Sequence, residues 1–445
     1  GPGMAALAVP RGIRARPPQP CAAPRRARGR RGASTLGTLG AAAVVLAISW
    51  RAWHSGGDVA GGPQVDTPAF VLGDKFAKQA APPTCSFAMG FALYFFGGGG
   101  KASETAAIVM IYFGAQTGMN LYMKSVFSQV VVEEGLKGIP IGLLLSSIQQ
   151  FVAFITFCVF LLVGKLFSIG YQVRKLTSNN EILAVLLFSV SFALNIGLNN
   201  FSLSLLAISI NMLIRSCLPL STQISQWLYD TATSKEKKAF VPLEWLLMLT
   251  GVVCAALATY AKSQATGGGT GDSAALVMGV IVCVASIFSG ALNMVLAGLL
   301  GTKMKLNAVD SVCYMALPAG LVLLVPALLV PHPMSRWEGF EGRYMTDWEV
   351  LGEVMDRNPM AMTPVLFSGL LSFVYNILQY SLVHKLSPTY ATFAGNFNKA
   401  ATVALSLLLG LESVPAGGYG TLFLLAVLGN LGAFTGYSLL KTKAK

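Results

Sequence analysis

Long apolar runs separated by short polar or charged breaks dominate this 445-residue chain. From residue 104 onward these runs recur at close to the ~20 residues that an α-helix needs to cross the hydrocarbon core of a bilayer. The sequence therefore predicts an all-α polytopic membrane protein. We expect ten transmembrane helices near residues 104–127, 139–163, 181–201, 204–228, 241–262, 274–300, 309–331, 362–383, 388–411 and 418–440.

The composition narrows the class of protein further. Hydrophobic residues make up 54% of the chain and charged residues only 11%, whereas soluble globular domains carry roughly 25% charged residues. This balance excludes a soluble enzyme and a disordered protein. The seven cysteines include no CxxC pair, and the chain holds three histidines. We therefore expect no disulfide framework, no metal site and no cofactor.

The N-terminal region carries most of the net charge of +13. Residues 1–101 hold 12 Lys and Arg against three Asp, which leaves only a small excess in residues 102–445 and no basic stripe for nucleic acid. An Arg-rich, acid-poor start is typical of an organelle transit peptide, although a GC-rich genome gives the same mixture. The apolar segment 35–50 is compatible with a signal anchor, a displaced signal core or an extra span. We expect residues 1–101 to form a targeting and linker region and residues 102–445 to form the ten-span domain.

Basic residues in the loops predict the orientation of the bundle. The loops after spans 2, 4, 6 and 8, together with the C-terminal segment, hold twelve Lys and Arg, and the opposite loops hold five. Loop Lys and Arg stay preferentially on the cytosolic side. Both ends of the bundle are therefore expected in the cytosol, or in the stroma of a plastid, with the acidic loop 332–360 on the far side.

Three basic residues fall inside the expected spans, namely Lys124, Arg215 and Lys399. No Asp or Glu lies mid-span to neutralise them, and a central Arg or Lys costs roughly 2.5–3.5 kcal/mol on insertion scales. Backbone carbonyls and trapped water could compensate the charge, and Lys124 could snorkel to the interface. For Arg215 and Lys399 we favour an exchangeable anion, because Arg offers a planar fork suited to phosphate and Lys a compact point charge.

The positions of these cations suggest an internal symmetry. Arg215 lies in the fourth of the first five spans and Lys399 in the fourth of the last five. Two halves of five spans each must have opposite topology, which is the inverted-repeat arrangement of many secondary transporters. Exchange of one anion for another needs no coupling carboxylate, so the lack of mid-span acids favours an exchanger over a proton or sodium symporter.

Polar uncharged side chains crowd the same spans. Each alone could serve as interhelical glue, but together amides, aromatics and cations suit a base, a sugar and a phosphate. No catalytic or metal-binding residue is expected. The predicted substrate-binding residues are Arg215, Lys399, Lys124, Asn120, Asn211, Tyr314, Tyr375, Asn396 and Asn398.

Four segments carry a resemblance to a known family. They are Met119–Lys124, the stretch NNFSLSLLAISINMLIRSCLPLST at 199–222, Tyr314–Pro318 and SPTYATFAGNFNKAATVALSLLLGLES at 387–413. In these segments the chain resembles the triose-phosphate/nucleotide-sugar transporter family of the drug/metabolite transporter superfamily. The resemblance implies a ten-helix antiporter with cytosolic termini, in which Arg215 and Lys399 match the basic residues that contact substrate phosphate.

One position departs from part of that family. Plastid sugar-phosphate exchangers have Lys-Arg in span 9, whereas Ala400 follows Lys399 here. Losing one guanidinium removes a bidentate phosphate contact. The segment Gly395–Lys399 is more similar to the corresponding segment of GDP-mannose-type transporters, but the match is partial and does not imply guanine specificity.

The sequence as a whole predicts a secondary-active antiporter of nucleotide-sugars or sugar-phosphates across an organelle membrane. Its expected partners are a phosphorylated substrate, a phosphorylated counter-substrate and the lipid bilayer, with a homodimer left open. The alternatives are a plastid-envelope sugar-phosphate/phosphate translocator, an orphan drug/metabolite exporter and an integral-membrane transferase. We expect no enzyme, because the acidic cluster at 338–356 contains no DxD pair.

The compartment rests on two conflicting signals. The Arg-rich tail favours a plastid, whereas Lys441 and Lys443 have the spacing of a di-lysine signal that retrieves endomembrane proteins. These lysines could equally complement the dipole of the last helix. Because Ala400 argues against the plastid sugar-phosphate class, we expect a Golgi or other endomembrane location, with the plastid envelope as the alternative.

Overall fold

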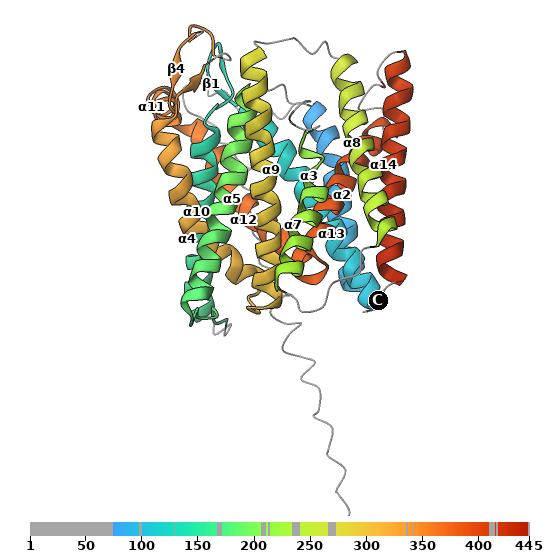
Figure 1. Ribbon diagram of the computed structural model, residues 1–445. Coiled ribbons are helices and arrows are strands. Elements are labelled where there is room, and N and C mark those ends of the chain that lie inside the picture. The colour runs from blue at the N-terminus through green and yellow to red at the C-terminus, as the bar shows by residue number, and fades with distance from the viewer. Residues whose placement is uncertain are drawn as a thin grey trace, which may run out of the picture. The chain divides into compact units, whose positions relative to one another are not determined.

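Helices form almost all of the regular structure in the computed structural model (Figure 1). All described residues belong to one compact unit, Gly62–Lys445. They are 74–97, 100–128, 130–166, 171–205, 211, 214–233, 241–265, 273–334, 337–340, 342–408, 414 and 417–443. The helices are α2 (Asp74–Phe96), α3 (Lys101–Ser128), α4 (Gly142–Leu166), α5 (Asn179–Leu205), α7 (Leu218–Thr233), α8 (Pro242–Ala265), α9 (Ser273–Thr302), α10 (Ala308–Leu329), α11 (Asp347–Arg357), the 3₁₀ helix η1 (Pro359–Met362), α12 (Thr363–Lys385), α13 (Pro388–Leu408) and α14 (Gly418–Lys443).

Among the described residues, six helical segments are long and apolar enough to cross a membrane, judged by length and composition. These are Gly142–Leu166, Asn179–Ser202, Val277–Thr302, Ala308–Leu329, Pro359–Lys385 and Gly418–Tyr437. Two shorter apolar helical segments, Pro83–Phe96 and Pro242–Ala258, accompany them. The prediction of a helical, polytopic membrane protein is confirmed at this level. Ten spans in two inverted repeats stay a prediction.

Each of the ten segments expected from the sequence coincides with a helix. The boundaries agree to within a few residues except at α7, which begins at Leu218 rather than near residue 204. Between α5 and α7, residues 211, 214 and 215 are helical, while 206–210 and 212–213 lie outside the described residues. Pro219 is the second residue of α7, and proline is tolerated in the first turn because that turn's N–H groups have no intrahelical partner.

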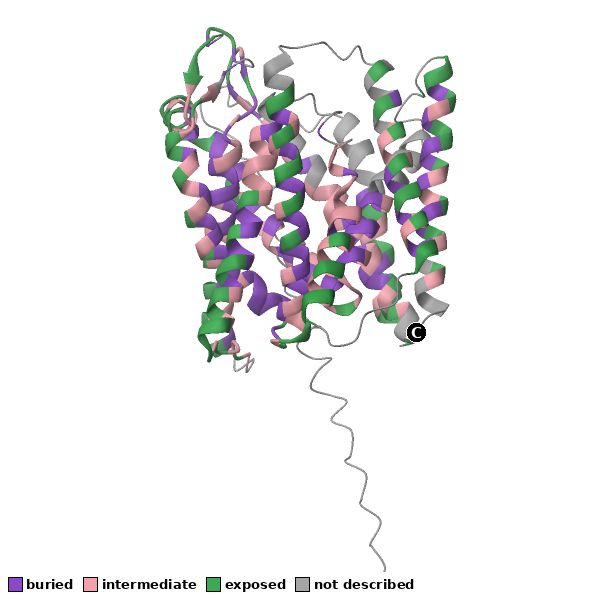
Figure 2. Cartoon of the chain, in the orientation of Figure 1, coloured by how far each residue is buried: buried purple, intermediate pink, exposed green. Residues whose placement is uncertain are grey.

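Close pairwise contacts hold the bundle together. The most extensive contacts join α5 to α9, α8 to α14 and α2 to α3, followed by α4 to α10. A central cluster buries Phe188, Tyr380 and Phe393 completely. Small residues let backbones approach, as at Gly369 of α12, where an added Cβ would lie 2.6 Å from the Cβ of Val152 in α4. Buried and exposed positions share most of the helices (Figure 2), and many of the exposed positions are large and apolar, as a lipid-facing surface requires.

One end of the bundle carries a folded cap (Figure 1). It consists of α11 and two antiparallel strand pairs, β1 (Val131–Glu133) with β2 (Leu136–Lys137) and β3 (His332–Pro333) with β4 (Tyr344–Met345). We call these elements the far-end cap. The sequence predicts only an acidic loop over 332–360, whereas part of this stretch forms strands and a helix. The end of α14 lies at the opposite end of the bundle.

Buried polar contacts tie the far-end cap to the helices. The Trp337 indole is fully buried and donates to the Gly138 carbonyl oxygen at 2.9 Å. Asp347 accepts a hydrogen bond from the backbone N–H of Leu144 at 2.7 Å and lies 2.9 Å from Nε2 of His332. The cap is therefore anchored to the first turn of α4.

The surface of the far-end cap carries an ion-pair cluster. Arg357, the last residue of α11, pairs with Glu133 of β1 and with Glu353 one helical turn earlier. Hydrogen bonds, first to Glu133 and then to Glu353, raise the pKa of the Arg357 guanidinium above its ordinary value. Arg357 thus stays charged and joins α11 to the first hairpin.

A helix also lies within the region that the sequence assigned to targeting and linking. The Ser86 hydroxyl of α2 donates to the Met110 carbonyl oxygen of α3 at 2.9 Å. An added Cβ at Gly90 would lie 2.7 Å from atoms of Ile111, so α2 and α3 approach at a glycine. The predicted apolar segment 35–50 lies outside the described residues.

Candidate functional site

Arg215 lies in the interior of the bundle, three residues before α7. Its side chain is half-buried. Nη1 donates to the Ser286 hydroxyl of α9 at 3.2 Å, and Nη2 donates to Oδ1 of Asn195 in α5 at 3.2 Å. Among the described residues, no Asp or Glu forms an ion pair with this guanidinium. Neutral groups therefore position the guanidinium without cancelling its charge.

An aromatic and amide cluster lies beside Arg215. The rings of Tyr112 (α3) and Tyr375 (α12) are stacked with centroids 6.0 Å apart and an interplanar angle of 19°. The two hydroxyls hydrogen-bond to each other, and the Gln116 side chain hydrogen-bonds to the Tyr375 hydroxyl. Tyr375 also interacts electrostatically with Arg215. We call Tyr112, Gln116 and Tyr375 the tyrosine–glutamine cluster.

Helix α13 closes the other side of this cluster. Nδ2 of Asn398 donates to Oε1 of Gln116 at 3.0 Å and to the Thr117 hydroxyl at 3.0 Å. At Gly395, an added Cβ would lie 3.4 Å from Nε2 of Gln116 and 3.5 Å from the Tyr112 hydroxyl. The lack of a side chain at Gly395 thus leaves α13 in close contact with the polar groups of the cluster.

A second asparagine of α13 binds the segment that carries Arg215. Nδ2 of Asn396 donates to the carbonyl oxygen of Ser216 at 2.8 Å. Lys399 belongs to the same helix, one residue after Asn398, although its side chain lies outside the described part of the structure. The backbone of α13 therefore runs beside both Arg215 and the tyrosine–glutamine cluster.

The remaining predicted residues lie in three different settings. Asn211 is buried and donates to the Ser202 hydroxyl at 2.6 Å. The Tyr314 hydroxyl donates to the Arg174 carbonyl oxygen at 2.7 Å, so it belongs to a separate network. Asn120 and Lys124 follow Gln116 on α3 by about one and two turns, and their side chains are outside the described residues.

The Tyr314 network occupies the loop between α4 and α5. There the Tyr171 hydroxyl donates to Oδ1 of Asp310 at 2.7 Å, and Arg174 forms an ion pair with Glu181 at 2.6 Å. Burial and the hydrogen bond to Asp310 raise the pKa of the Tyr171 hydroxyl. These contacts connect the loop to the first turn of α10, and they do not involve Arg215.

Several residues of the site are absent from the predicted set. Asn195 and Gln116 are amides within expected spans, so the residue-type criterion that selected Asn396 and Asn398 could have included them. Tyr112 precedes Gln116 by four residues and shares its helix face. Ser286 has no such signal, because serine is common in membrane helices.

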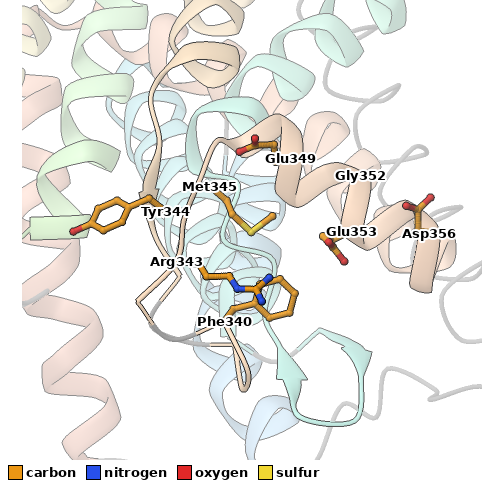
Figure 3. Close-up of a pocket in the computed structure, with 8 residues that line it drawn as sticks. All are labelled: Phe340, Arg343, Tyr344, Met345, Glu349, Gly352, Glu353 and Asp356. Carbon is orange, nitrogen blue, oxygen red and sulfur yellow. The ribbon is translucent and has the colours of Figure 1, made fainter.

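A shallow groove of about 550 Å³ lies on the far-end cap (Figure 3). It runs between the strand segment with Arg343 and Tyr344 and the acidic face of α11. Glu349 already forms the capping box of α11 with Thr346, and Glu353 pairs with Arg357. None of the predicted binding residues lines this groove.

In the part of the chain that the structure describes, the interior site offers the Arg215 cation without an acidic partner, stacked aromatic rings and several amides. This set suits an anion attached to polar, ring-containing groups. Among the described residues, no group of three or more His, Cys, Asp or Glu side chains gathers as a metal site requires.

Two proteins to which this chain is similar are named as carriers of sugar compounds. No protein-family model matches it. It is 26% identical over 226 residues to "UDP-galactose transporter 1" of Arabidopsis thaliana, covering 50% of this chain and 57% of the relative. It is 23% identical over 238 residues to a "Probable sugar phosphate/phosphate translocator" of the same plant, covering 53% and 58%. The matched regions thus span somewhat more than half the length of these curated relatives.

These two relatives confirm the resemblance drawn from the sequence. Both are named as transporters of the kinds found in the triose-phosphate/nucleotide-sugar transporter family, and neither is named as an enzyme. One solved structure, described only as a crystal structure of a protein, aligns with a TM-score of 0.46 at 13% identity over 75% of this chain and 97% of that one. That similarity is too low to establish a shared fold.

Proposed function

We propose that this protein is a secondary-active antiporter of nucleotide-sugars or sugar-phosphates across an organelle membrane. The observation that carries the proposal is the interior Arg215, held by the neutral Ser286 and Asn195 and without an acidic partner among the described residues. A buried cation of this kind is costly unless an anion binds to it. The printed names of the two relatives supply the substrate classes.

We assign the substrate-binding site to Arg215, the tyrosine–glutamine cluster and the adjoining face of α13. Asn396 and Asn398 place α13 against both, so Lys399 is proposed as the second phosphate-binding cation. Asn120 and Lys124 are proposed to extend the site along α3. Asn211 and Tyr314 are proposed to support it from neighbouring networks.

Antiport across an inverted-repeat bundle is part of the proposal. The bundle would consist of the ten helical segments expected from the sequence, with Arg215 in the fourth of the first five and Lys399 in the fourth of the last five. A phosphorylated ligand would stabilise the two proposed cations, Arg215 and Lys399, whenever it occupies the site. A change of orientation with the site empty would leave both positive charges without an anion and would therefore be slow. The carrier would then need a phosphorylated ligand in each direction, which is obligatory exchange.

The proposal is tested by exchange in proteoliposomes made with the purified full-length chain. Vesicles are loaded with a nucleoside monophosphate or with inorganic phosphate, and the uptake of labelled nucleotide-sugars and triose phosphates is measured. We expect uptake only when a phosphorylated counter-substrate is inside. Uptake of none of these compounds, or equal uptake into vesicles without counter-substrate, would contradict the antiport proposal.

Two variants show whether the proposed cations carry the exchange. Arg215→Ala and Lys399→Ala should abolish uptake while the protein still inserts and purifies, because each change removes a costly charge from the interior. The matched control is Arg343→Ala, which removes an exposed arginine of the far-end cap and should leave uptake unchanged. Full transport by Arg215→Ala would show that this residue has only a structural role.

The choice of compartment follows the choice of substrate. An endomembrane, Golgi-type location is proposed because Ala400 lacks the guanidinium of plastid sugar-phosphate exchangers and because one relative is named as a UDP-galactose transporter. A plastid-envelope sugar-phosphate/phosphate translocator is the second candidate, favoured by the other relative's name. Exchange of triose phosphate for inorganic phosphate, or import of a reporter fused to residues 1–101 into plastids, would select the second candidate.

A further inference from the structure

Two polar residues from two separate helices form a closed set with the Arg215 guanidinium. Nη1 donates to the Ser286 hydroxyl and Nη2 to Oδ1 of Asn195. The Ser286 hydroxyl lies 2.9 Å from the backbone carbonyl oxygen of Asn195 and 3.4 Å from its Oδ1. Ser286 is fully buried. The two ends of the guanidinium are thus attached to α5 and α9, which are themselves linked to each other.

The packing of α5 on α9 is shaped around this asparagine. Gly290 lies one helical turn after Ser286, and an added Cβ there would be only 2.7 Å from Oδ1 of Asn195. Real Cβ atoms do not approach oxygen that closely, so a glycine at this position leaves the room that the Asn195 amide occupies. The arrangement therefore depends on Asn195, Ser286 and Gly290 together.

Both acceptors are neutral, and this has an electrostatic consequence. A carboxylate in place of either acceptor would form an ion pair with Arg215 and cancel the charge that a ligand needs. An amide oxygen and a hydroxyl can hold the planar fork in one orientation while its positive charge remains. The same guanidinium lies within electrostatic range of Tyr375 of α12, a member of the tyrosine–glutamine cluster.

We infer that Asn195 and Ser286 are positioning residues that orient the Arg215 guanidinium toward the tyrosine–glutamine cluster and keep its charge available to a phosphorylated ligand. The inference rests on the proposed function, because it assigns a role within the same site. It adds that the specificity for anions depends on the neutrality of Asn195, a residue that is not itself required to contact the ligand.

Replacement of Asn195 by the isosteric Asp is the most direct test. Asn195→Asp keeps the shape and the acceptor atom but places a carboxylate beside Nη2. We expect the exchange of phosphorylated substrates to fall at least about tenfold, mainly through a higher half-saturating concentration (KM), with thermal stability retained or increased. An amide that only joined α5 to α9 would tolerate this isosteric change without a rise in KM.

A second variant keeps the inference testable if Asn195→Asp fails to fold. Ser286→Ala removes the acceptor of Nη1 and adds no bulk, and it should raise KM several-fold while changing the maximal exchange rate less. The matched control is Asn293→Ala. Asn293 is a fully buried asparagine of the same α5–α9 interface whose Nδ2 donates to the Phe188 carbonyl oxygen at 3.1 Å, so its loss should lower stability without changing KM.

The outcomes separate the inference from the proposed function. Measurable exchange by the wild-type chain with an unchanged KM in Asn195→Asp, or in Ser286→Ala where Asn195→Asp does not fold, would overturn the positioning role alone. A rise in KM in Asn293→Ala equal to that in Ser286→Ala would also overturn it, because a general loosening of the interface would then suffice. No exchange by the wild-type chain would instead reject the proposed function.

Discussion

Under the proposed function, single side chains determine whether the interior of this bundle accepts an anion. Arg215 has the charge, while the rings of Tyr112 and Tyr375 and the amide of Gln116 form its polar neighbourhood. These groups come from α3, α12 and the segment before α7. The contribution of one hydroxyl can be measured against that of a buried hydroxyl elsewhere in the bundle.

Removal of the Tyr375 hydroxyl should weaken substrate binding. Tyr375→Phe keeps the ring stack but loses the hydrogen bonds to Tyr112 and Gln116, and a hydrogen bond is worth about 0.5–1.5 kcal/mol. We expect a rise in KM of about three- to tenfold in proteoliposome exchange. Tyr380→Phe is the control, because it also removes a buried tyrosine hydroxyl, but one that hydrogen-bonds to Asn293 at 3.3 Å and does not belong to the tyrosine–glutamine cluster. Equal KM values in both variants would contradict a binding role for Tyr375.

At the scale of elements, close helix contacts and the anchoring of the far-end cap determine the shape of the bundle. Without water in the hydrocarbon core, helices associate through close packing and interhelical hydrogen bonds. Gly369 supplies a close contact between α12 and α4, and Asp347 supplies a buried polar link between α11 and α4.

Enlarging Gly369 should separate α12 from α4. In Gly369→Ala the new Cβ would meet Val152 at 2.6 Å, and overpacking of this kind costs typically 1–3 kcal/mol. We expect a lower melting temperature in detergent. The matched control is Gly352→Ala in α11, where no atom lies within 4 Å of the added Cβ and alanine favours a helix by about 1 kcal/mol. A melting temperature of Gly369→Ala equal to wild type would show that the contact relaxes freely.

Loss of the Asp347 carboxylate should loosen the far-end cap. Asp347→Ala leaves the N–H of Leu144 without its acceptor and His332 without its partner, and an unsatisfied buried group costs about 1–3 kcal/mol. We expect faster proteolysis within 332–357 at unchanged exchange activity. Asp356→Ala, an exposed position near the end of the same helix, is the control. The idea that Asp347 anchors the cap would be abandoned if both variants were cleaved at the wild-type rate.

At the scale of the whole molecule, the far-end cap and the end of α14 lie at opposite ends of the bundle (Figure 1). This arrangement agrees with the charge count of the loops, which predicts the basic ends on the cytosolic side and 332–360 on the far side. The orientation in a membrane can be measured directly.

Tags at the two ends should respond differently to selective permeabilisation. A tag after Lys445 should be accessible when only the plasma membrane is opened, whereas a tag inserted near Gly352 should require opening of the organelle membrane. If the tag near Gly352 is not labelled even after full permeabilisation, the folded cap is hiding it from the antibody. A second tag inserted near Gly342 is the control for this case. The opposite labelling pattern would contradict both the orientation and the ten-span count.

The sequence by itself determined the helices and the class of protein. Each expected span coincides with a helix because an apolar run of membrane length can satisfy its backbone only within itself, and this requirement is local. The interior charge of Arg215 was equally evident, since a basic residue within an apolar run can be recognised without knowing which residues surround it.

Only the tertiary structure decided which residues surround that charge. Ser286 is 71 residues from Arg215 in sequence, and Asn396 is 180 residues from Ser216, so helix packing alone brings them together. The same packing places the Tyr314 hydroxyl on the Arg174 carbonyl oxygen and turns part of 332–360 into strands and a helix. Residue type and periodicity specify the face of a helix, but the partner of that face follows from the close contacts made at positions such as Gly290 and Gly369.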